Sequence, residues 1–299
     1  MNSLKRVLKI ADQYRIDDGK KFRLKHIDPA DTGGLKVSSK RQAKLLLRNS
    51  VEELSDLQDK LYADNHWALL IILQAMDAAG KDGTIKHVMS GLNPQGVDVH
   101  SFKAPSSEEL DHDYLWRCMR VLPERGRIGI FNRSYYEETL VVRVHRELLG
   151  RENLPTQLVT KHIWKERFDD IVSFERYLSR NGIVVRKFFL HISREEQKKR
   201  FLARLDNPQK HWKFSAADIR ERQFWDDYHD AYEDMIRHTS TEEAPWYVIP
   251  ADHKWFSRLV VAAAVTDTLG KLDLKYPALT ADQEAQLKEA RKQLLKNDR

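Results

Sequence analysis

Short apolar runs alternate with longer amphipathic segments along this chain, and this alternation limits the fold more than any other feature. Residues 67–75 (WALLIILQA), 127–134 (RIGIFNRS), 183–193 (IVVRKFFLHIS) and 245–251 (PWYVIPA) are predicted as strands, and residues 97–103 (VDVHSFK) alternate as a strand does. Helical segments separate these runs. We therefore expect βαβ crossovers and a mostly parallel sheet that carries helices on both faces.

Apolar residues at helical spacing predict the helices between these strands. They cover residues 39–63, 80–92, 106–122, 157–182, 194–205 and 253–272, and a polar helix is expected in the tail after Pro277. Ser38 or Ser39 is placed to cap the first helix, and Ser-Ser-Glu-Glu gives the helix at 106 a capping signature. Residues 1 to about 38 hold Pro and Gly without a period, which predicts an irregular polar arm.

No repeat and no strong linker divides the 299 residues, so we expect a single domain. Its expected parts are an N-terminal arm and helix (1–66), a basic lid at about 194–225 and a C-terminal tail (278–299). The single Cys118 excludes an internal disulfide and fits a reducing compartment. The N-terminus lacks the apolar core of a signal peptide, and no apolar run is long enough to span a membrane. We expect a cytoplasmic protein without a membrane partner.

The net charge of +6 is not spread evenly. Residues 186–222 contain eleven Lys or Arg and five Asp or Glu, a surplus of six that equals the surplus of the whole chain. A local field of that sign attracts polyanions. Nucleic acid is the default candidate, and a nucleotide or an inorganic phosphate chain fits the same field.

The segment after the first central strand, DAAGKDG (77–83), is the best candidate for a phosphate site. Ligands of α/β sheets bind at the carboxyl ends of strands, and a helix N-terminus attracts anions. The expected contacts are Lys81 and the backbone of Ala78, Ala79, Gly80, Asp82 and Gly83. The usual phosphate-loop pattern is not met, because Ala75 replaces a Gly and Asp82 replaces a Ser or Thr. An ordinary strand–turn–helix with a surface lysine is the alternative.

Asp77 separates these two interpretations, because a carboxylate beside phosphates is unfavourable unless a cation lies between them. If the loop binds phosphate, we expect Asp77 to bind Mg²⁺ directly or through water. Phosphate-loop enzymes place a second metal-binding carboxylate at a neighbouring strand end, where this chain has Asn132. Arg133 would contact a transferring phosphoryl group, and Glu137 would restore the missing charge. A helix-capping Asn with surface charges is the alternative.

Together these motifs closely resemble the polyphosphate kinase 2 family. The resemblance runs in order over roughly residues 30–275 and is carried by QAMDAAGKDGTIKHVMSGLNPQGVDVHSFKAPSSEELDHDYLWR, GRIGIFNRSYYEETLVVRVH, RFLARLDNPQKHWKFSAAD and APWYVIPADHKWFSR. The Asn of FNRSYYEE, where other members have Asp, resembles class III of that family.

The resemblance implies a three-layer α/β/α phosphate-loop kinase fold similar to thymidylate kinase, with a parallel sheet, a helical lid and assembly into dimers or tetramers. It implies reversible transfer of the terminal phosphoryl group of inorganic polyphosphate to AMP and ADP, with ATP, GMP and GDP as further nucleotide partners. The implied cofactor is Mg²⁺, with Mn²⁺ as an alternative.

The family's functional residues fall on Asp77 and Lys81 in the loop, on Asn132 and Arg133 in the second motif, and on Arg200 and Arg204 in the lid. Ala75 and Asn132 depart from the Gly and Asp that many members have. The expected metal ligands are Asp77, Asn132 and Glu137, of which Asp77 is the chief one.

The residues themselves agree with a phosphoryl-transfer site. Arg200 and Arg204 are four positions apart and share a helix face, from which guanidinium groups would bind phosphates bidentately. Lys86 lies in the second turn after Lys81 and would meet the polyphosphate chain. A loose transition state needs positioning, Mg²⁺ and cations, so we expect Lys81, Arg133, Arg200 and Arg204 to neutralise charge and expect no catalytic triad.

Two other functions remain open from the sequence. An ATP-dependent nucleotide or small-molecule kinase would use the same fold but would need a base pocket for its donor. A nucleic-acid-binding module would use the basic segment and would bind in a salt-sensitive manner. The kinase interpretation predicts no nucleic-acid partner.

Overall fold

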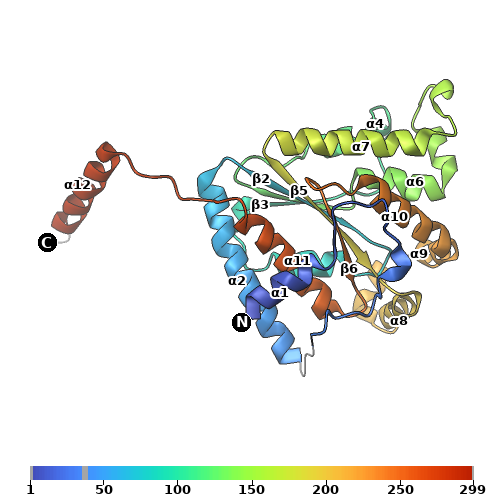
Figure 1. The fold of residues 1–299 in the computed structure, drawn as a ribbon, viewed down its shortest axis with the longest axis horizontal. Helices are drawn as coiled ribbons and strands as arrows, with labels where there is room; N and C mark the ends of the chain where they lie inside the picture. Colours follow the sequence, from blue (N-terminus) through green and yellow to red (C-terminus); the bar gives the residue numbers. More distant parts are fainter. Residues whose placement is uncertain (1–2, 36–39, 298–299) are drawn as a thin grey trace.

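The computed structural model describes residues 3–35 and 40–297. Within them, six strands form one sheet with the order β1-β6-β5-β2-β4-β3 (Figure 1). In chain order the strands are β1 (Arg15–Ile16), β2 (Ala68–Gln74), β3 (Val97–Ser101), β4 (Ile128–Asn132), β5 (Ile183–His191) and β6 (Trp246–Pro250). All neighbours pair in parallel except the edge strand β1, which is antiparallel to β6. The predicted mostly parallel sheet is confirmed.

Helices cover both faces of this sheet. The α-helices are α1 (Ser3–Asp12), α2 (Lys40–Asp64), α3 (Lys81–Val88), α4 (Ser107–Leu110), α5 (Trp116–Met119), α6 (Val141–Val144), α7 (Ile163–Arg180), α8 (Arg194–Leu205), α9 (Ala216–Glu221), α10 (Trp225–Thr239), α11 (Lys254–Gly270) and α12 (Ala281–Asn297). One layer contains α11 with α1, α2 and α3, each of which contacts α11. The other layer contains α7 and α10, which also contact each other (Figure 1). The predicted three-layer arrangement is confirmed.

The central strand β2 fixes the position of the sheet edge from which the loop over residues 75–80 begins. All seven of its residues are buried, as expected for a parallel strand covered on both faces. It lies between β5 and β4, and Leu73 pairs with both Asn132 and Phe188. The carboxyl ends of three strands therefore meet at one edge, beside the loop that follows β2.

The prediction of an irregular N-terminal arm is wrong for residues 3–16 and holds for residues 17–35, where the one regular element described is the 3₁₀ turn η1 (Leu24–His26). Residues from Ser3 to Asp12 form α1, which packs on α11, and β1 adds an edge strand to β6. Ile10, Ala11 and Tyr14 are buried, so their side chains supply an apolar face that packs on the core. The expected cap at Ser38 or Ser39 lies outside the described residues.

Two helices also differ from their predictions. The single helix expected over 106–122 is split into α4 and α5, although the capping box between Ser106 and Glu109 is confirmed. The interruption arises where the Asp113 carboxylate accepts a hydrogen bond from Leu115 N at 2.9 Å, a local bond that competes with a continuous helix. Helix α10 was not predicted, although its residues are amphipathic and its apolar face packs against α7.

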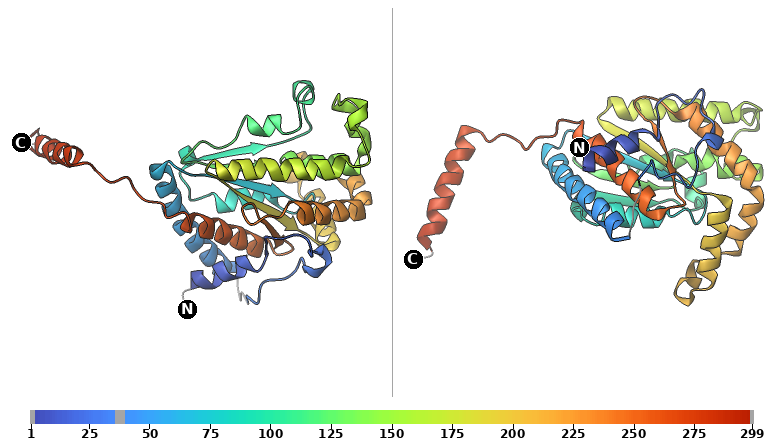
Figure 2. Two further views of the ribbon diagram at one scale, coloured as in Figure 1. Left: turned by 45° about the horizontal axis from the view of Figure 1, so that its top comes forward. Right: turned by 60° about the horizontal axis from the view of Figure 1, so that its bottom comes forward.

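The C-terminal tail is helical, as expected, and α12 stands well away from the body of the molecule in every view (Figures 1 and 2). An extended segment after the end of α11 connects it. None of the helices in the described part of the chain combines the length and the apolar character needed to cross a membrane.

Candidate functional site

The loop over residues 75–80 joins β2 to α3 at the carboxyl edge of the sheet. Two of its residues have left-handed backbone, Ala78 with φ 61° and Gly80 with φ 112°. Gly80 adopts this conformation readily and directly precedes α3. Ala78 does so at a cost, because its Cβ crowds the backbone there. The surroundings of Ala78 must therefore hold the loop in place.

Arg200 of α8 provides that support. Its five N–H groups donate to four backbone carbonyls and one carboxylate: Ala78 O (3.2 Å), Ala79 O (2.7 Å), Ala251 O (2.6 Å), Asp252 O (3.0 Å) and Glu196 Oε1 (2.8 Å). The guanidinium has no further N–H group to offer, and the side chain is buried. The structure thus places Arg200 against the loop backbone, whereas the family's lid role would require it to face a ligand.

Lys81 begins α3 and folds back over the loop. Its ammonium group donates a hydrogen bond to Ala75 O at 2.8 Å. Burial lowers the pKa of Lys81, and the nearby Asp77 carboxylate partly offsets this effect. An anion bound at the loop would supply further compensation for burying this charge.

Asp77 faces Arg133, which follows β4. The Arg133 Nη2 atom lies 3.4 Å from Asp77 Oδ1, near the upper limit for a hydrogen bond, and the two side chains are 40% and 31% exposed. Arg133 itself has a left-handed backbone (φ 65°), which turns its side chain back toward the loop. This ion pair is loose and accessible, so either partner is available to a ligand.

Asn132 lies between the loop helix and β3. Its Nδ2 donates to Asp82 Oδ1 at 3.1 Å and approaches Ser101 Oγ at 3.4 Å. Its Oδ1 is buried and has no hydrogen-bond partner in the described part of the chain. A buried carbonyl oxygen without a donor is suited to accept from a metal-bound water or to ligate a cation weakly.

Glu137 completes the cluster. Burial raises the pKa of Glu137, while Arg133 and Lys81 act in the opposite direction. In the amide orientation that satisfies both of its groups, buried Gln74 at the end of β2 donates to Glu137 Oε1 at 2.9 Å. Gln74 was not predicted as a site residue, although a polar residue at the carboxyl end of a buried central strand indicates such a position.

The expected magnesium site fits these residues only as an open one. Across residues 3–35 and 40–297, no three His, Cys, Asp or Glu side chains converge as a closed metal cage. Mg²⁺ is usually held by one or two carboxylates together with substrate phosphates and waters. Asp77, Glu137 and the unpartnered oxygen of Asn132 fit that partial ligand set.

The segment α8–η6–α9, with η6 spanning Pro208–Lys213, extends away from the body of the molecule (Figure 2). Gln197 of α8 donates to Asp77 O at 3.0 Å, a contact that the sequence did not suggest. Arg204, one turn beyond Arg200, pairs with Asp218 of α9 at 3.2 Å and lies 5.3 Å from the Phe201 ring. The two arginines that share a helix face in sequence therefore have different neighbours.

Two further cations lie beside the loop and were missed. Lys254 and Arg258 occupy the first turns of α11, and a Cβ at Gly83 of α3 would lie 3.2 Å from Arg258 Nη2. Burial lowers the pKa of both, and neighbouring Arg200 lowers each further. Lys86 is exposed on α3, three residues after Gly83. The sequence does contain a signal for this pair, because the two cations are four residues apart at the start of the helix that follows β6.

A cleft of about 580 Å³ opens on the opposite side, between β3 and α5. Ser101, which approaches Asn132, lines its inner end. Arg117 donates to Lys103 O at 2.8 Å and lies 5.5 Å from the Phe102 ring. The cleft thus combines cationic and aromatic walls next to the loop.

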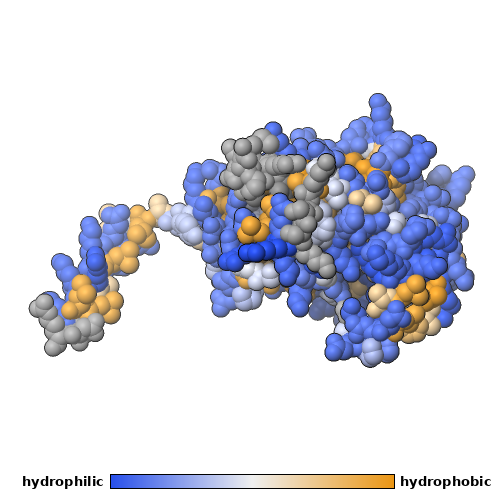
Figure 3. All heavy atoms as spheres, turned by 90° about the horizontal axis from the view of Figure 1, so that it is seen from below, coloured by the Kyte–Doolittle hydropathy of each residue, from blue (hydrophilic) through white to orange (hydrophobic). Residues whose placement is uncertain are grey.

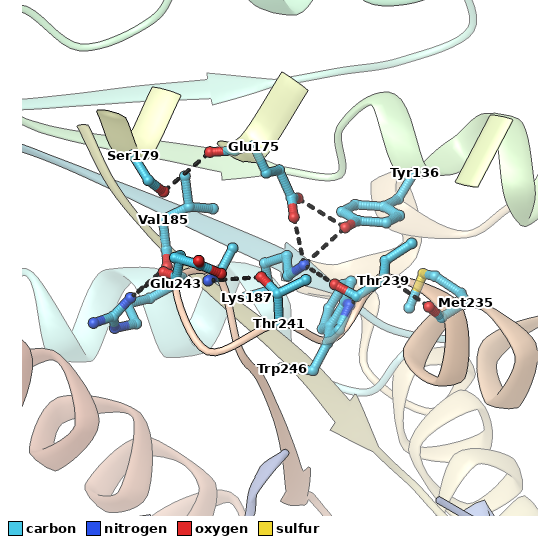
Figure 4. A network of polar contacts seen from close by, with 12 residues as sticks. Tyr136, Glu175, Ser179, Val185, Lys187, Met235, Thr239, Thr241, Glu243 and Trp246 are labelled. Atoms are coloured by element: carbon cyan, nitrogen blue, oxygen red, sulfur yellow. Dashed lines mark hydrogen bonds and ion pairs between the residues drawn. The ribbon is translucent and has the colours of Figure 1, made fainter. Parts of the chain in front are cut away.

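A buried polar network supports the turn that carries Arg133 and Glu137 (Figure 4). Lys187 Nζ donates to three acceptors: Glu175 Oε2 (2.6 Å), Tyr136 Oη (3.0 Å) and Thr239 O (2.7 Å). Glu175 Oε1 accepts from the hydroxyl groups of Tyr135 at 2.9 Å and Tyr136 at 2.7 Å. All three N–H groups of Lys187 are satisfied, so the network fixes the two tyrosines that lie between Arg133 and Glu137.

The buried network lowers the positive charge that the basic segment presents to a ligand. Lys187 was counted in the basic segment, but its side chain is fully buried and paired with Glu175. Arg186 donates to Thr268 Oγ1 at 3.0 Å on α11 and is also outside the projecting segment. The positive field of that segment is therefore weaker than the count from the sequence suggested.

The structure brings most of the predicted site residues together. Those around the loop are Asp77, Ala78, Ala79, Gly80, Lys81, Asp82, Asn132, Arg133 and Glu137. Gly83 and Lys86 lie along α3, Arg200 lies against the loop backbone, and Arg204 lies toward α9.

Comparison with known proteins identifies relatives of this chain. A family model described as Polyphosphate kinase 2 matches residues 37–277. The chain is 52% identical to the ADP-polyphosphate phosphotransferase of Rhodopseudomonas palustris, over 95% of this chain and 98% of that protein. It is 45% identical to the AMP/ADP-polyphosphate phosphotransferase of Meiothermus ruber, over 89% of this chain and 95% of that protein.

A solved structure supports the same assignment. The crystal structure of Polyphosphate Kinase 2 from Arthrobacter aurescens superposes with a TM-score of 0.84 at 41% identity, covering 94% of this chain and 96% of that chain. The shared α/β architecture confirms the phosphate-loop kinase fold expected from the sequence. The chain belongs to the polyphosphate kinase 2 family.

Proposed function

We propose that this protein transfers the terminal phosphoryl group of inorganic polyphosphate to AMP and ADP, reversibly, with GMP and GDP as further acceptors. The observation that carries the proposal is the convergence of Asp77, Lys81 and Arg133 at the loop after β2. The names of the relatives support the substrate class, since they cite ADP, AMP/ADP and, for a Pseudomonas aeruginosa protein at 38% identity, GDP.

Two surfaces flank the loop, and we assign one substrate to each. A nucleotide needs an aromatic pocket for its base, which the cleft beside β3 offers through Phe102 and Trp116. A phosphate chain needs only a row of cations, which Lys86, Lys254 and Arg258 provide on the other side. The terminal phosphates of the two substrates would then meet at Lys81.

In the reaction, an oxygen of the nucleotide's terminal phosphate forms a bond to the terminal phosphorus of polyphosphate. The bond from that phosphorus to the bridging oxygen breaks, and the chain leaves one unit shorter. The attacking oxygen is already ionised near neutral pH, so the protein has no strong base to supply. Lys81 and Arg133 neutralise charge on the moving group, and the loop backbone orients it.

Bound Mg²⁺ would supply charge neutralisation between the two phosphate groups. The residues that would hold it are Asp77, Glu137 and Asn132, with Mn²⁺ as a substitute ion. Asp77 also keeps Arg133 close to the loop until a phosphate arrives, because the two side chains are paired.

We assign different roles to the two arginines of α8. Arg200 acts as a positioning residue, since its N–H groups bind the loop backbone and leave none for phosphate. Arg204 keeps the role implied by the family, because its ion pair with Asp218 lies on the projecting segment. Movement of that segment toward the loop would bring Arg204 to the phosphates.

The direct test is to incubate the protein with Mg²⁺, polyphosphate and either ADP or AMP, without ATP. We expect ATP from ADP, and ADP followed by ATP from AMP. Parallel reactions with GMP and GDP define the base preference. Absence of any nucleoside triphosphate in all four reactions would exclude the proposal.

The substrate assignment has its own test, in a matched pair of variants. Arg258→Gln should raise KM for polyphosphate and leave KM for ADP unchanged. Lys103→Met, in the cleft, should raise KM for ADP and leave KM for polyphosphate unchanged. The reverse pattern would exchange the two surfaces.

The other candidate functions give different results. An ATP-dependent kinase would phosphorylate an acceptor from ATP without polyphosphate. A nucleic-acid-binding module would bind RNA or DNA in a salt-sensitive way and would tolerate Asp77→Asn. We further propose a cytoplasmic location, where nucleotides are available, and assembly into a dimer or tetramer, which sedimentation would measure.

A further inference from the structure

Helix α12 is an unusual element of this molecule, because it is folded but unsupported. It is about 25 Å long, from its 17 residues at 1.5 Å each. Side chains from residue 275 to residue 296 are all exposed, and both Figure 1 and Figure 2 show the helix held away from the body. It also lies beyond residue 277, where the family match ends.

One side of α12 carries an apolar stripe (Figure 3). Leu287, Ala290 and Leu294 follow one another at spacings of three and four residues, as in the seam of a two-helix coiled coil. Leu287 is 57% exposed and Leu294 is 70% exposed. Isolated helices of this length are marginal in water, so a partner that covers the stripe would stabilise this one.

The charges of α12 indicate which partner fits. The first part of the helix, residues 281–286, has two acids, Asp282 and Glu284, and no Lys or Arg. The rest, residues 287–297, has four cations and one acid, a net charge of +3: Lys288, Glu289, Arg291, Lys292 and Lys296. A second copy of the same helix in antiparallel orientation would place acidic against basic ends twice, whereas a parallel copy would oppose like charges.

We propose that α12 is an interaction arm that pairs with α12 of a second copy of this chain in antiparallel orientation. The pairing buries Leu287 and Leu294 of both copies, and the small Ala290 between them lets the helices approach closely. An antiparallel pair is symmetric, since each helix presents the same surface to the other, as a two-fold dimer requires. The arm is separate from the loop site, so this proposal does not depend on the proposed reaction.

Thiol cross-linking in the full-length protein tests the pairing directly. Ala290→Cys places a thiol in the seam, and Ala285→Cys places one on the outer face of the same helix as a matched control. The native Cys118 is buried and burial raises its pKa to about 12, so it contributes little background. We expect a short bis-maleimide to link the Ala290→Cys protein roughly tenfold faster than the Ala285→Cys protein, because pairing raises the local thiol concentration.

Charge reversal tests the orientation. Asp282→Lys with Glu284→Lys makes both parts of the helix basic and should abolish cross-linking of the Ala290→Cys protein. Lys288→Glu with Arg291→Glu and Lys292→Glu makes both parts acidic and should do the same. Mixing the two reversed proteins should restore cross-linking, since an acidic helix then meets a basic one in either orientation. The orientation is tested by the loss in each reversed protein alone, because a parallel pair would oppose like charges both before and after the reversal.

Two results would overturn the proposal. Equal cross-linking rates at positions 285 and 290 would show that the apolar stripe is not an interface. Cross-linking that survives charge reversal, or that mixing fails to restore, would show that α12 binds another surface or pairs in another orientation. None of these measurements requires catalytic activity, so a failure of the proposed reaction would remain distinguishable.

Discussion

The two sides of the loop after β2 are built on different principles. On the supporting side, Arg200 has an acceptor for each of its five N–H groups, and Lys187 has one for each of its three. On the ligand side, the ion pair of Asp77 and Arg133 is long, at 3.4 Å, and partly exposed. Saturated buried networks resist rearrangement, whereas loose exposed pairs exchange partners readily.

This difference suggests how a loop with an unfavourable backbone can serve phosphoryl transfer. The supporting side fixes Ala78 and the turn that contains Tyr135 and Tyr136, so the positions of Lys81, Arg133 and Glu137 are set before a ligand arrives. The ligand side leaves Asp77 and Arg133 free to re-pair with a cation and a phosphate. Preorganised charges of this kind cost no rearrangement during the reaction.

The largest loss of stability is expected from replacing Glu175 on the supporting side. Glu175→Leu leaves the Lys187 ammonium buried without its counter-ion and should lower the free energy of unfolding by about 3–5 kcal/mol. Guanidinium unfolding measures this. Glu175→Leu combined with Lys187→Met should recover a large part of the loss, because no buried charge remains. Equal losses in the single and double variants would mean that packing, and not charge, dominates.

On the ligand side, Asp77→Asn and Lys81→Ala should each reduce kcat by about 10²-fold or more. Their unfolding midpoints should stay close to that of the parent protein, since both side chains lie at the ligand face. Polyphosphate-dependent ATP synthesis and thermal unfolding, measured on the same samples, separate the two effects. Near-normal turnover in either variant would contradict the proposed site.

The supporting scaffold should also respond to pH through His191 at the end of β5. Burial lowers the pKa of His191 from 6.5 to about 4, so between these values the unfolded chain binds the proton that the folded chain does not. Stability is therefore complete above about pH 6.5 and should fall by about 2 kcal/mol by pH 5. His191→Phe should flatten this part of the curve, and parallel curves for the two proteins would contradict the assignment.

The smallest changes in stability are expected from two matched variants on α8, one at Arg200 and one at Arg204. Arg200→Lys keeps the charge but loses the planar set of donors and should cost about 1–2 kcal/mol of stability, with reduced turnover. Arg204→Lys should change stability by less than about 1 kcal/mol, because its pair with Asp218 is partly exposed. Similar stability changes in both variants would remove the distinction between the two arginines.

The sequence predicted the fold where local signals were strong. The buried run of β2, the capping box at Ser106 and the helix over residues 194–205 all appear as expected. It failed for α1 and α10, although both segments are amphipathic and carry the periodic signal of a helix. Their apolar faces pack against α11 and α7, contacts that the sequence does not specify.

For the site, the sequence by itself determined which charged groups follow which strand, because the carboxyl ends of parallel strands share one edge. The sequence therefore predicts that Asp77, Lys81 and Arg133 lie together. Only the tertiary structure decided that Arg200 supports the loop while Arg204 turns toward α9, and that Lys187 belongs to the core. The physical reason is that spacing along a helix or strand fixes the face on which a side chain lies, whereas the neighbour packed on that face fixes its partners.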